Sequence, residues 1–454
     1  MTTPLTLAES PELSNAPNMV PADLEPASSE EPKKWKFRST FVLAAAIFVA
    51  LNALMSFSTP FPFDCYKFNY KGWSWWTFNA LRHSDKISNV AILGSSTMVS
   101  AIAGCDANYL QRGLDLTEHH RASYFEAQLK KKMPAGEFQT FSLAAPGQVP
   151  SDAYITLKAM VATKSRPDIV VYGLAPRDFI DSTLTAPGDT DAFRYLTRIV
   201  NIEDVARKVF RTPLGKLDWS LQRLVYLYGY SLDFRMAGTD AATIAMDRLF
   251  PRPWSKTPFT WWDRRAVLPG YLPAEIHPEA VMAGPIDLKT AKSRYTDNTV
   301  EYVQRYKQPD AHTYRTQMYF LGKIAEFCRK ERIELVLVNM PITLQNLRLL
   351  KAGGYIRYLQ SLREFSMIHK VACYDLNDFS KYSQQDFHDS VHLNAFGGQK
   401  FFDDMCQSIF NDERLHQLVA MAGEHLAKHR SLGNEASKRS LADKPDPAKI
   451  RLPF

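Results

Sequence analysis

The sequence predicts an α/β fold in which a parallel sheet is sandwiched between helices. The first observation is a set of short apolar runs that suit buried strands, at 89–96, 138–147, 167–179, 333–343 and 371–377. The second is a set of segments with apolar residues at helical spacing, at 122–133, 151–164, 313–332 and 354–370. The two kinds of segment alternate along the chain. Such alternation is typical of parallel sheets whose strands are connected by helices.

The composition is that of a globular protein. Of the 454 residues, 45% are hydrophobic and 23% are charged, which excludes a wholly disordered chain, a collagen-like repeat and a polytopic membrane protein. The five cysteines form no Cys-x-x-Cys pair. A disulfide scaffold and a cysteine zinc site are therefore not expected, and the sequence predicts no cofactor.

Charge is spread unevenly along the chain. Residues 1–32 contain six acidic and no basic residues, so the other 42 of the 48 acidic residues and all 55 basic residues lie in 33–454, a net charge of about +13. This excess suits an anionic partner such as a membrane surface or an acidic polymer. Because no dense basic run with interleaved aromatic residues occurs, nucleic acid is not an expected partner.

Residues 39–59 predict a transmembrane helix. This stretch of 21 residues has no charge, and about 20 residues cross a hydrocarbon core. Four basic residues come just before it, at 33, 34, 36 and 38. The positive-inside rule then predicts a single-pass membrane protein with a cytoplasmic N-terminus and an extracytoplasmic main domain, periplasmic or at the cell surface. The alternatives are a buried helix of a soluble domain and a cleaved signal peptide.

The rest of the chain divides by composition. Residues 1–38 predict a disordered cytoplasmic N-terminus, 60–84 a juxtamembrane linker, 85–420 the main domain and 421–454 a flexible tail. The linker is aromatic and is expected to form an interfacial belt, with Phe61, Phe63, Tyr66, Trp73, Trp75 and Trp76. Residues 183–294 form an insertion rich in Pro and aromatic residues, either a lid, a membrane-facing flap or a packed appendage.

A serine follows the first strand of the main domain. The segment ILGSSTM delivers Gly94, Ser95 and Ser96 into a turn that opens a helix. In open parallel sheets, ligands bind at the carboxyl ends of the strands. Ser96 would lie at a helix N-terminus, where backbone N–H groups stabilise a developing oxyanion. A serine needs a base to act as a nucleophile, and a serine after a strand is more often only a helix cap.

The segment DSVHLN, residues 389–394, supplies a base. Asp389 and His392 are three residues apart, so both side chains can face the same way. The carboxylate could hold the Nδ1–H of the imidazole and leave Nε2 to accept a proton from Ser96. The alternative to a catalytic pair is a solvated loop in which Asp389 and His392 have no functional role.

Together these two motifs resemble the SGNH/GDSL hydrolase superfamily. Gly94-Ser95-Ser96 is similar to its Gly-Asp-Ser block, with Ser95 in place of Asp, and 389–394 is similar to its Asp-x-x-His block. The resemblance covers both ends of the main domain, roughly 200 of the 454 residues. It implies a flavodoxin-like three-layer fold, with Ser96 as nucleophile, His392 as general base and Asp389 as the acid that orients it. The GSS variant is also similar to an envelope-anchored branch that acts in alginate acetylation or D-alanine transfer to wall polymers.

The family's oxyanion hole is matched only in part. It uses the N–H of the serine, a Gly of a second block and an Asn of a third block, which here reads YGLAPRDF and has no Asn. The resemblance implies Gly147 as the second donor. Arg177 or Asp178 could replace the third, or backbone donors could suffice, and the alternative for Arg177 and Asp178 is a structural ion pair. Asn339, at the end of a later strand, is a further candidate. The candidate oxyanion and substrate-binding residues are thus Gly94, Gly147, Gly173, Arg177, Asp178 and Asn339.

Three rival sites fit less well. His388 and His392 have zinc-ligand spacing, but no third ligand block follows and HDSVH lacks the Glu of His-Glu-x-x-His, so no metal is predicted. The Gly-x-Ser-x-Gly of α/β-hydrolases is absent. A nucleotide site would need a glycine-rich fingerprint that GSSTM does not have.

The sequence therefore predicts a membrane-anchored serine esterase or O-acyltransferase that acts on acylated extracytoplasmic glycans or other esters. The alternative is a non-catalytic binding or assembly module of an envelope polysaccharide machine with a degenerate site. Trp254, Trp261 and Trp262 of the insertion could stack on sugar rings in such a module. In either case, envelope polysaccharide-biosynthesis proteins are candidate partners.

Overall fold

A computed structural model describes residues 39–58, 72–84, 88–111, 116–163, 166–184, 186–210, 212–231, 295–307 and 310–442, with isolated positions 114, 234, 238 and 248 between them. The chain forms two units, 1–58 and 59–454. The predicted N-terminus 1–38 lies outside the described residues. Most of the Pro- and aromatic-rich part of the insertion, with Trp254, Trp261 and Trp262, lies outside them too.

The first unit contains a single described element, helix α1 (Ser39–Ser58). Its window Thr40–Phe57 has a mean hydropathy of 2.1, and none of this window is buried by protein. Among the described residues it is the one helix that is long and apolar enough to cross a membrane. Its length and composition are therefore sufficient for a membrane span.

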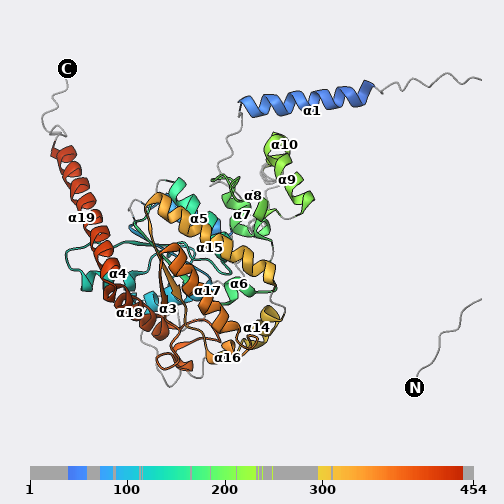
Figure 1. The fold of residues 1–454 in the computed structure, drawn as a ribbon. Helices are drawn as coiled ribbons and strands as arrows, with labels where there is room; N and C mark the ends of the chain where they lie inside the picture. The colour runs from blue at the N-terminus through green and yellow to red at the C-terminus, as the bar shows by residue number, and fades with distance from the viewer. Residues whose placement is uncertain are drawn as a thin grey trace, which may run out of the picture. The chain divides into compact units, whose positions relative to one another are not determined.

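A five-stranded parallel sheet forms the centre of the second unit (Figure 1). Its strands are β1 (Val90–Gly94), β2 (Thr140–Ser142), β3 (Ile169–Leu174), β4 (Glu334–Asn339) and β5 (Ala372–Asp375). The spatial order is β2-β1-β3-β4-β5, and every neighbouring pair is parallel. This is the strand order of flavodoxin-like sheets, in which the chain turns back at β1 and leaves a crevice between the ends of β1 and β3.

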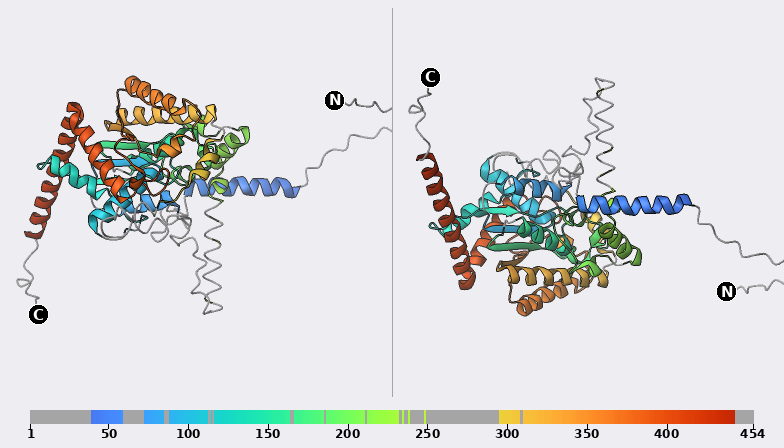
Figure 2. Two further views of the ribbon diagram at one scale, coloured as in Figure 1. Left: turned by 90° about the horizontal axis from the view of Figure 1, so that it is seen from below. Right: turned by 90° about the horizontal axis from the view of Figure 1, so that it is seen from above.

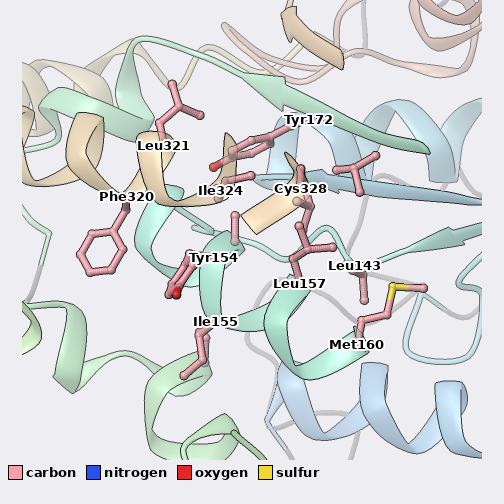
Figure 3. Packing of buried hydrophobic residues seen from close by; sticks show 14 of the residues in the cluster. Leu143, Tyr154, Ile155, Leu157, Met160, Tyr172, Phe320, Leu321, Ile324 and Cys328 are labelled. Atoms are coloured by element: carbon pink, nitrogen blue, oxygen red, sulfur yellow. The ribbon is translucent and has the colours of Figure 1, made fainter. Parts of the chain in front are cut away.

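Alternate residues of each strand face opposite sides of the sheet. In β1, Ala91 and Leu93 belong to one hydrophobic cluster, whereas Val90 and Ile92 belong to another. Figure 3 shows part of the first cluster, in which residues of α5 and α15 pack together beside Tyr172 of β3. The second cluster contains residues of α3, α4, α18 and α19. The views in Figure 2 show α15 and α17 on one side of the sheet and α3 on the other, which makes the unit three-layered.

The helices of this unit are named as in Figure 1. Before the insertion they are α2 (Trp73–Arg82), α3 (Ser96–Leu110), α4 (Ser123–Lys132), α5 (Pro150–Ala162) and α6 (Arg177–Ile180). The insertion contributes α7 (Asp191–Leu196), α8 (Ala206–Val209), α9 (Pro213–Leu224) and α10 (Tyr226–Gly229). After it come α14 (Thr299–Tyr306), α15 (Ala311–Glu331), α16 (Leu344–Leu347), α17 (Gly354–His369), α18 (Ala395–Asn411) and α19 (Glu413–Ala442).

The segment that the sequence predicts as a linker at 60–84 is partly helical. Helix α2 occupies 73–82, and Trp75, Phe78 and Leu81 are buried in the first cluster. Trp73 is buried as well, and its Nε1 donates a hydrogen bond to the carbonyl of Ala144 at 2.9 Å. The prediction that Trp73 and Trp75 form an interfacial belt is therefore wrong. Both an interface and a domain core favour tryptophan, so composition alone does not separate them.

The described part of the insertion begins as a packed appendage. Phe193 and Leu196 of α7 lie in the first cluster, together with Val209 of α8. Helices α9 and α10 then continue with no buried residue. Burial therefore fixes the first half of the described insertion onto the sheet layers and leaves its second half on the surface.

The C-terminal boundary also differs from the prediction. Helix α19 runs to Ala442 and so occupies much of the predicted tail 421–454. Four apolar residues of α19 are buried at successive spacings of four, three and four residues, which is about one helical turn each: Leu415, Val419, Ala422 and Leu426. Asn89 donates from Nδ2 to the carbonyl of Ala422 at 3.0 Å. The tail is therefore held by a helical stripe of apolar residues, and 443–454 lie outside the described residues.

Candidate active site

Ser96 is the first residue of α3 and follows β1 by one residue. The N–H groups in the first turn of a helix have no partner within the helix and carry the positive end of its dipole. The turn between β1 and α3 is tight, because a Cβ on Gly94 would lie 2.6 Å from the Cβ of Met98. Ser96 therefore lies at the carboxyl edge of the sheet, where open parallel sheets bind ligands.

The structure brings Ser96, His392 and Asp389 together. The Oγ of Ser96 lies 2.8 Å from the Nε2 of His392, across 296 residues of sequence. The Nδ1 of His392 lies 2.7 Å from Oδ2 of Asp389. Both ring nitrogens of this histidine are thus engaged within the triad.

Asp389 is held as a carboxylate. Its Oδ1 accepts hydrogen bonds from the N–H groups of Val391 and His392, both at 2.9 Å. Burial raises the pKa of Asp389, but the charge of His392 and these hydrogen bonds outweigh burial and lower the pKa to about 2. For His392 the balance is the reverse. Burial lowers its pKa, and the charge and hydrogen bond of Asp389 raise it above the ordinary histidine value.

A close helix crossing positions the base against the serine. Helices α3 and α18 approach so closely that a Cβ on Gly104 would lie 2.9 Å from the N of Ala395. A Cβ on Gly398 would lie 2.5 Å from the carbonyl oxygen of Ala101. Glycine at both positions therefore permits the contact. Because Ser96 begins α3 and residue 392 comes three residues before α18, this crossing brings the two ends of the main domain to one place.

The loop after β2 is fixed next to the serine. Gln148 accepts a hydrogen bond from the N–H of Gly94 at 3.0 Å and donates from Nε2 to the carbonyl of Leu143 at 2.9 Å. The N–H of Ala145 donates to the carbonyl of Gly94 at 3.0 Å. Gly147, between these anchors, has φ of 74°, which favours glycine. Gln148 was not predicted as a site residue, because it lies six residues after the end of β2 and matches no motif.

Arg177 begins α6 and lies beside Gly147. A Cβ placed on Gly147 would be 3.7 Å from Nη2 of Arg177. The Nε of Arg177 donates to Oδ2 of Asp181 at 3.0 Å, while Nη1 is buried and lies 3.6 Å from Oδ1 of Asp178. The positive charge also acts on His392, whose pKa it lowers. Arg177 therefore places a charged guanidinium beside the Gly147 loop while two of its nitrogens face carboxylates.

A buried carboxylate pair holds Arg177 in place. Asp181 also accepts a hydrogen bond from Nη1 of Arg305 at 2.7 Å, and its pKa is lowered by these cations despite burial. Asp178 is fully buried, and its Oδ2 accepts from the N–H of Ala175 at 2.9 Å. Burial raises the pKa of Asp178 to about 6, and Arg177, 3.6 Å away, opposes this rise. Asp178 thus fixes the turn after β3 through Ala175 and pairs with the guanidinium of Arg177.

The two remaining candidates, Gly173 and Asn339, make contacts within the fold instead of with Ser96. Gly173 pairs with Gly94 inside the sheet, and a Cβ there would lie 2.5 Å from Cε of Met98. Asn339 ends β4, which is two strands from β1. Its Nδ2 donates to Tyr355 at 2.8 Å and to Asp375 at 2.7 Å, so both of its amide protons are used. The structure does not bring Asn339 to Ser96.

Comparison with known proteins adds no identification. No family model matches the sequence, and no curated protein matches it. The functional assignment therefore depends on the geometry of the site itself, since fold alone does not imply function.

Proposed function

We propose that the chain is a membrane-anchored serine esterase or O-acyltransferase of the SGNH/GDSL type, acting on ester or acyl groups of extracytoplasmic glycans. The single observation that carries this proposal is the position of the His392 ring, with Nε2 2.8 Å from Ser96 and Nδ1 2.7 Å from Asp389. A serine, a base and an orienting carboxylate in this order are the parts of a nucleophilic acyl-transfer site.

In the first half of the reaction, Ser96 is acylated. Its Oγ attacks the acyl carbon of the ester while its proton passes to Nε2 of His392, which becomes a cation paired with Asp389. The carbonyl oxygen becomes an oxyanion next to the N-terminus of α3 and the Gly147 loop. When the intermediate collapses, the bond from carbon to the leaving oxygen breaks. His392 returns the proton to that oxygen, and the alcohol departs.

In the second half, the acyl group leaves Ser96. The hydroxyl of water or of an acceptor sugar gives its proton to Nε2 of His392 and attacks the acyl carbon. Collapse of this second intermediate breaks the bond to Ser96 Oγ, which recovers the proton from His392. Water as acceptor makes the reaction ester hydrolysis, and a glycan hydroxyl makes it O-acyl transfer.

Arg177 is the residue that we infer to replace the family's third-block asparagine. Its Nη2 lies on the side of Gly147, 3.7 Å from the position of a Cβ there, while Nε and Nη1 face Asp181 and Asp178. An ionised donor aimed at the developing oxyanion is stronger than an amide. Its salt bridge to buried Asp181 fixes its direction before substrate binds, which reduces the cost of reorganisation in the transition state.

Labelling of the full-length protein by a fluorophosphonate probe, together with p-nitrophenyl acetate hydrolysis, tests the chemistry. We expect Ser96→Ala to abolish both signals and Ser95→Ala, the matched control in the same motif, to keep them. Unchanged labelling of Ser96→Ala would remove this serine from the mechanism. Mass spectrometry of an oligosaccharide incubated with the parent and the ester then separates transfer from hydrolysis. Glycan binding with no turnover in the parent would instead support the assembly-module alternative.

A further inference from the structure

Helix α9 exposes a stripe of leucines. Leu214, Leu217, Leu221 and Leu224 are 78%, 55%, 37% and 76% exposed. Spacings of three and four residues place all four on one side of a helix. The helix buries none of its residues, so the stripe has no cover among the described residues. A row of four leucines is larger than the single exposed apolar residues that are normal on a surface.

The opposite side of α9 faces the protein. Trp219 stacks on Phe210 with ring centroids 5.7 Å apart, and Phe210 packs against the first hydrophobic cluster. The guanidinium of Arg223 lies 5.2 Å from the centroid of Trp219. These contacts set the rotation of the helix, with its tryptophan inward and its leucines outward. The stripe is therefore a fixed feature of the surface.

The chain joins the second unit close to these helices. Ser74 donates its N–H to Oδ2 of Asp191, the first residue of α7, at 3.1 Å. A Cβ on Gly72 would lie 2.1 Å from Oδ1 of the same residue. Helices α7, α8, α9 and α10 gather at one corner of the unit (Figure 1). Only residues 59–71 separate α1 from Gly72, and a chain of that length reaches at most about 50 Å.

We propose that the leucine stripe of α9 inserts into the surface of the lipid bilayer in which α1 is anchored. An amphipathic helix with a leucine face and cations beside it is the usual form of a helix that lies in a membrane interface. Exposed Lys216, on the same helix as the leucines, supplies positive charge, which suits anionic headgroups. The short connection keeps this corner within reach of the bilayer. The inference rests on the proposed membrane anchor and is independent of the proposed chemistry.

Docking of this kind would limit the orientation of the domain. A domain held by a single flexible connection can tumble, whereas a second contact at α9 fixes one face toward the lipid. The candidate active site would then keep a constant direction relative to the membrane. This arrangement suits a substrate that is presented by, or delivered from, the membrane surface.

Spin labels on the full-length protein in vesicles of phosphatidylcholine and phosphatidylglycerol test the inference. Single cysteines are introduced as Leu217→Cys or Leu221→Cys in a background with Cys65→Ser and Cys373→Ser. The other cysteines, Cys105, Cys328 and Cys406, are buried. Gln222→Cys, exposed on a different side of α9, is the matched control, and Leu51→Cys within α1 reports on the anchor. The measurement is relaxation of each label by oxygen, which concentrates in lipid, and by a water-soluble nickel chelate.

We expect the labels at 217, 221 and 51 to favour oxygen and the label at 222 to favour the nickel chelate. Lipid contact at 51 with water contact at 217 and 221 would overturn the docking and leave the anchor intact. Shielding of 217 and 221 from both agents would also overturn it, because protein would then cover the stripe. Water contact at 51 would reject the anchor, and the docking that rests on it would fall with it.

Discussion

The Oγ of Ser100 donates a hydrogen bond to the backbone carbonyl of Leu393 at 2.9 Å, across 293 residues of sequence. Ser100 lies one helical turn after Ser96, and Leu393 directly follows His392. This bond ties the backbone of the base to the helix that carries the serine. Together with the glycine contacts between α3 and α18, it explains how the backbone holds Ser96 and His392 within hydrogen-bond distance.

The helix crossing predicts a steric effect at Gly398. In Gly398→Ala the new Cβ would lie 2.5 Å from the backbone oxygen of Ala101, which cannot move freely. We expect a loss of about 1–3 kcal/mol in the free energy of unfolding, as for other overpacked positions, together with reduced esterase activity. Gly322→Ala in α15 is the control, because its Cβ would meet only His369 at 3.8 Å. That change should leave stability equal or raise it by up to about 1 kcal/mol. Urea titration of both variants measures the difference, and equal stability would contradict the steric argument.

The raised pKa of His392 predicts the pH dependence of the reaction. A general base must be neutral, so activity rises as the pH rises through the pKa of His392. Because Asp389 raises this pKa, we expect the midpoint of kcat/KM to lie above the ordinary histidine value of about 6.5. Asp389→Asn removes the charge and should move the midpoint downward while lowering kcat by about 10⁴-fold. A pH profile of both proteins gives the two midpoints. A midpoint that is the same in the variant would show that Asp389 does not act on the histidine.

Loss of the arginine beside Gly147 should act on the rate. Arg177→Ala removes the ionised donor that we propose for the oxyanion, and loss of one such donor costs about 10²–10³-fold in kcat. KM should change little, because the interaction strengthens only in the transition state. Arg305→Ala is the matched control. Arg305 also binds Asp181, but its second partner is the exposed Glu301 of the same helix, α14. Steady-state kinetics and melting curves separate the cases. Equal effects of both variants on kcat would reduce Arg177 to a structural role.

Asn339 should contribute to stability more than to the rate. It is buried, and Asn339→Ala would leave the hydroxyls of Tyr355 and Tyr358 and the carboxylate of Asp375 without this partner. Unpaired buried polar groups cost about 1–3 kcal/mol each, so the melting temperature should fall. Activity measured well below that temperature should fall far less than in Arg177→Ala. A drop in kcat of about 10²-fold in this variant would instead make Asn339 an oxyanion donor.

The strand pattern and the triad residues could be predicted because their signals are local. Strands buried on both faces must be continuous apolar runs, so β1, β3 and β4 are visible in the sequence. The sequence also indicated Ser96, Asp389 and His392, because a strand-end serine and an Asp-x-x-His pair are short motifs. The helical continuation of α19 had a local signal too, in the spacing of Leu415, Val419, Ala422 and Leu426, although composition there suggested a flexible tail.

The sequence by itself determined the alternation of strands and helices, the apolar helix at 39–58 and the chemical identity of the triad. Only the tertiary structure decided which strand ends share one edge. Asn339 ends β4 and Arg177 comes shortly after β3, but β4 lies two strands from β1 whereas β3 lies next to it. Strand order depends on contacts between segments far apart in the chain, and no local propensity encodes it. The same reason explains why tryptophans predicted for a membrane interface lie in the core, since burial depends on what packs against them.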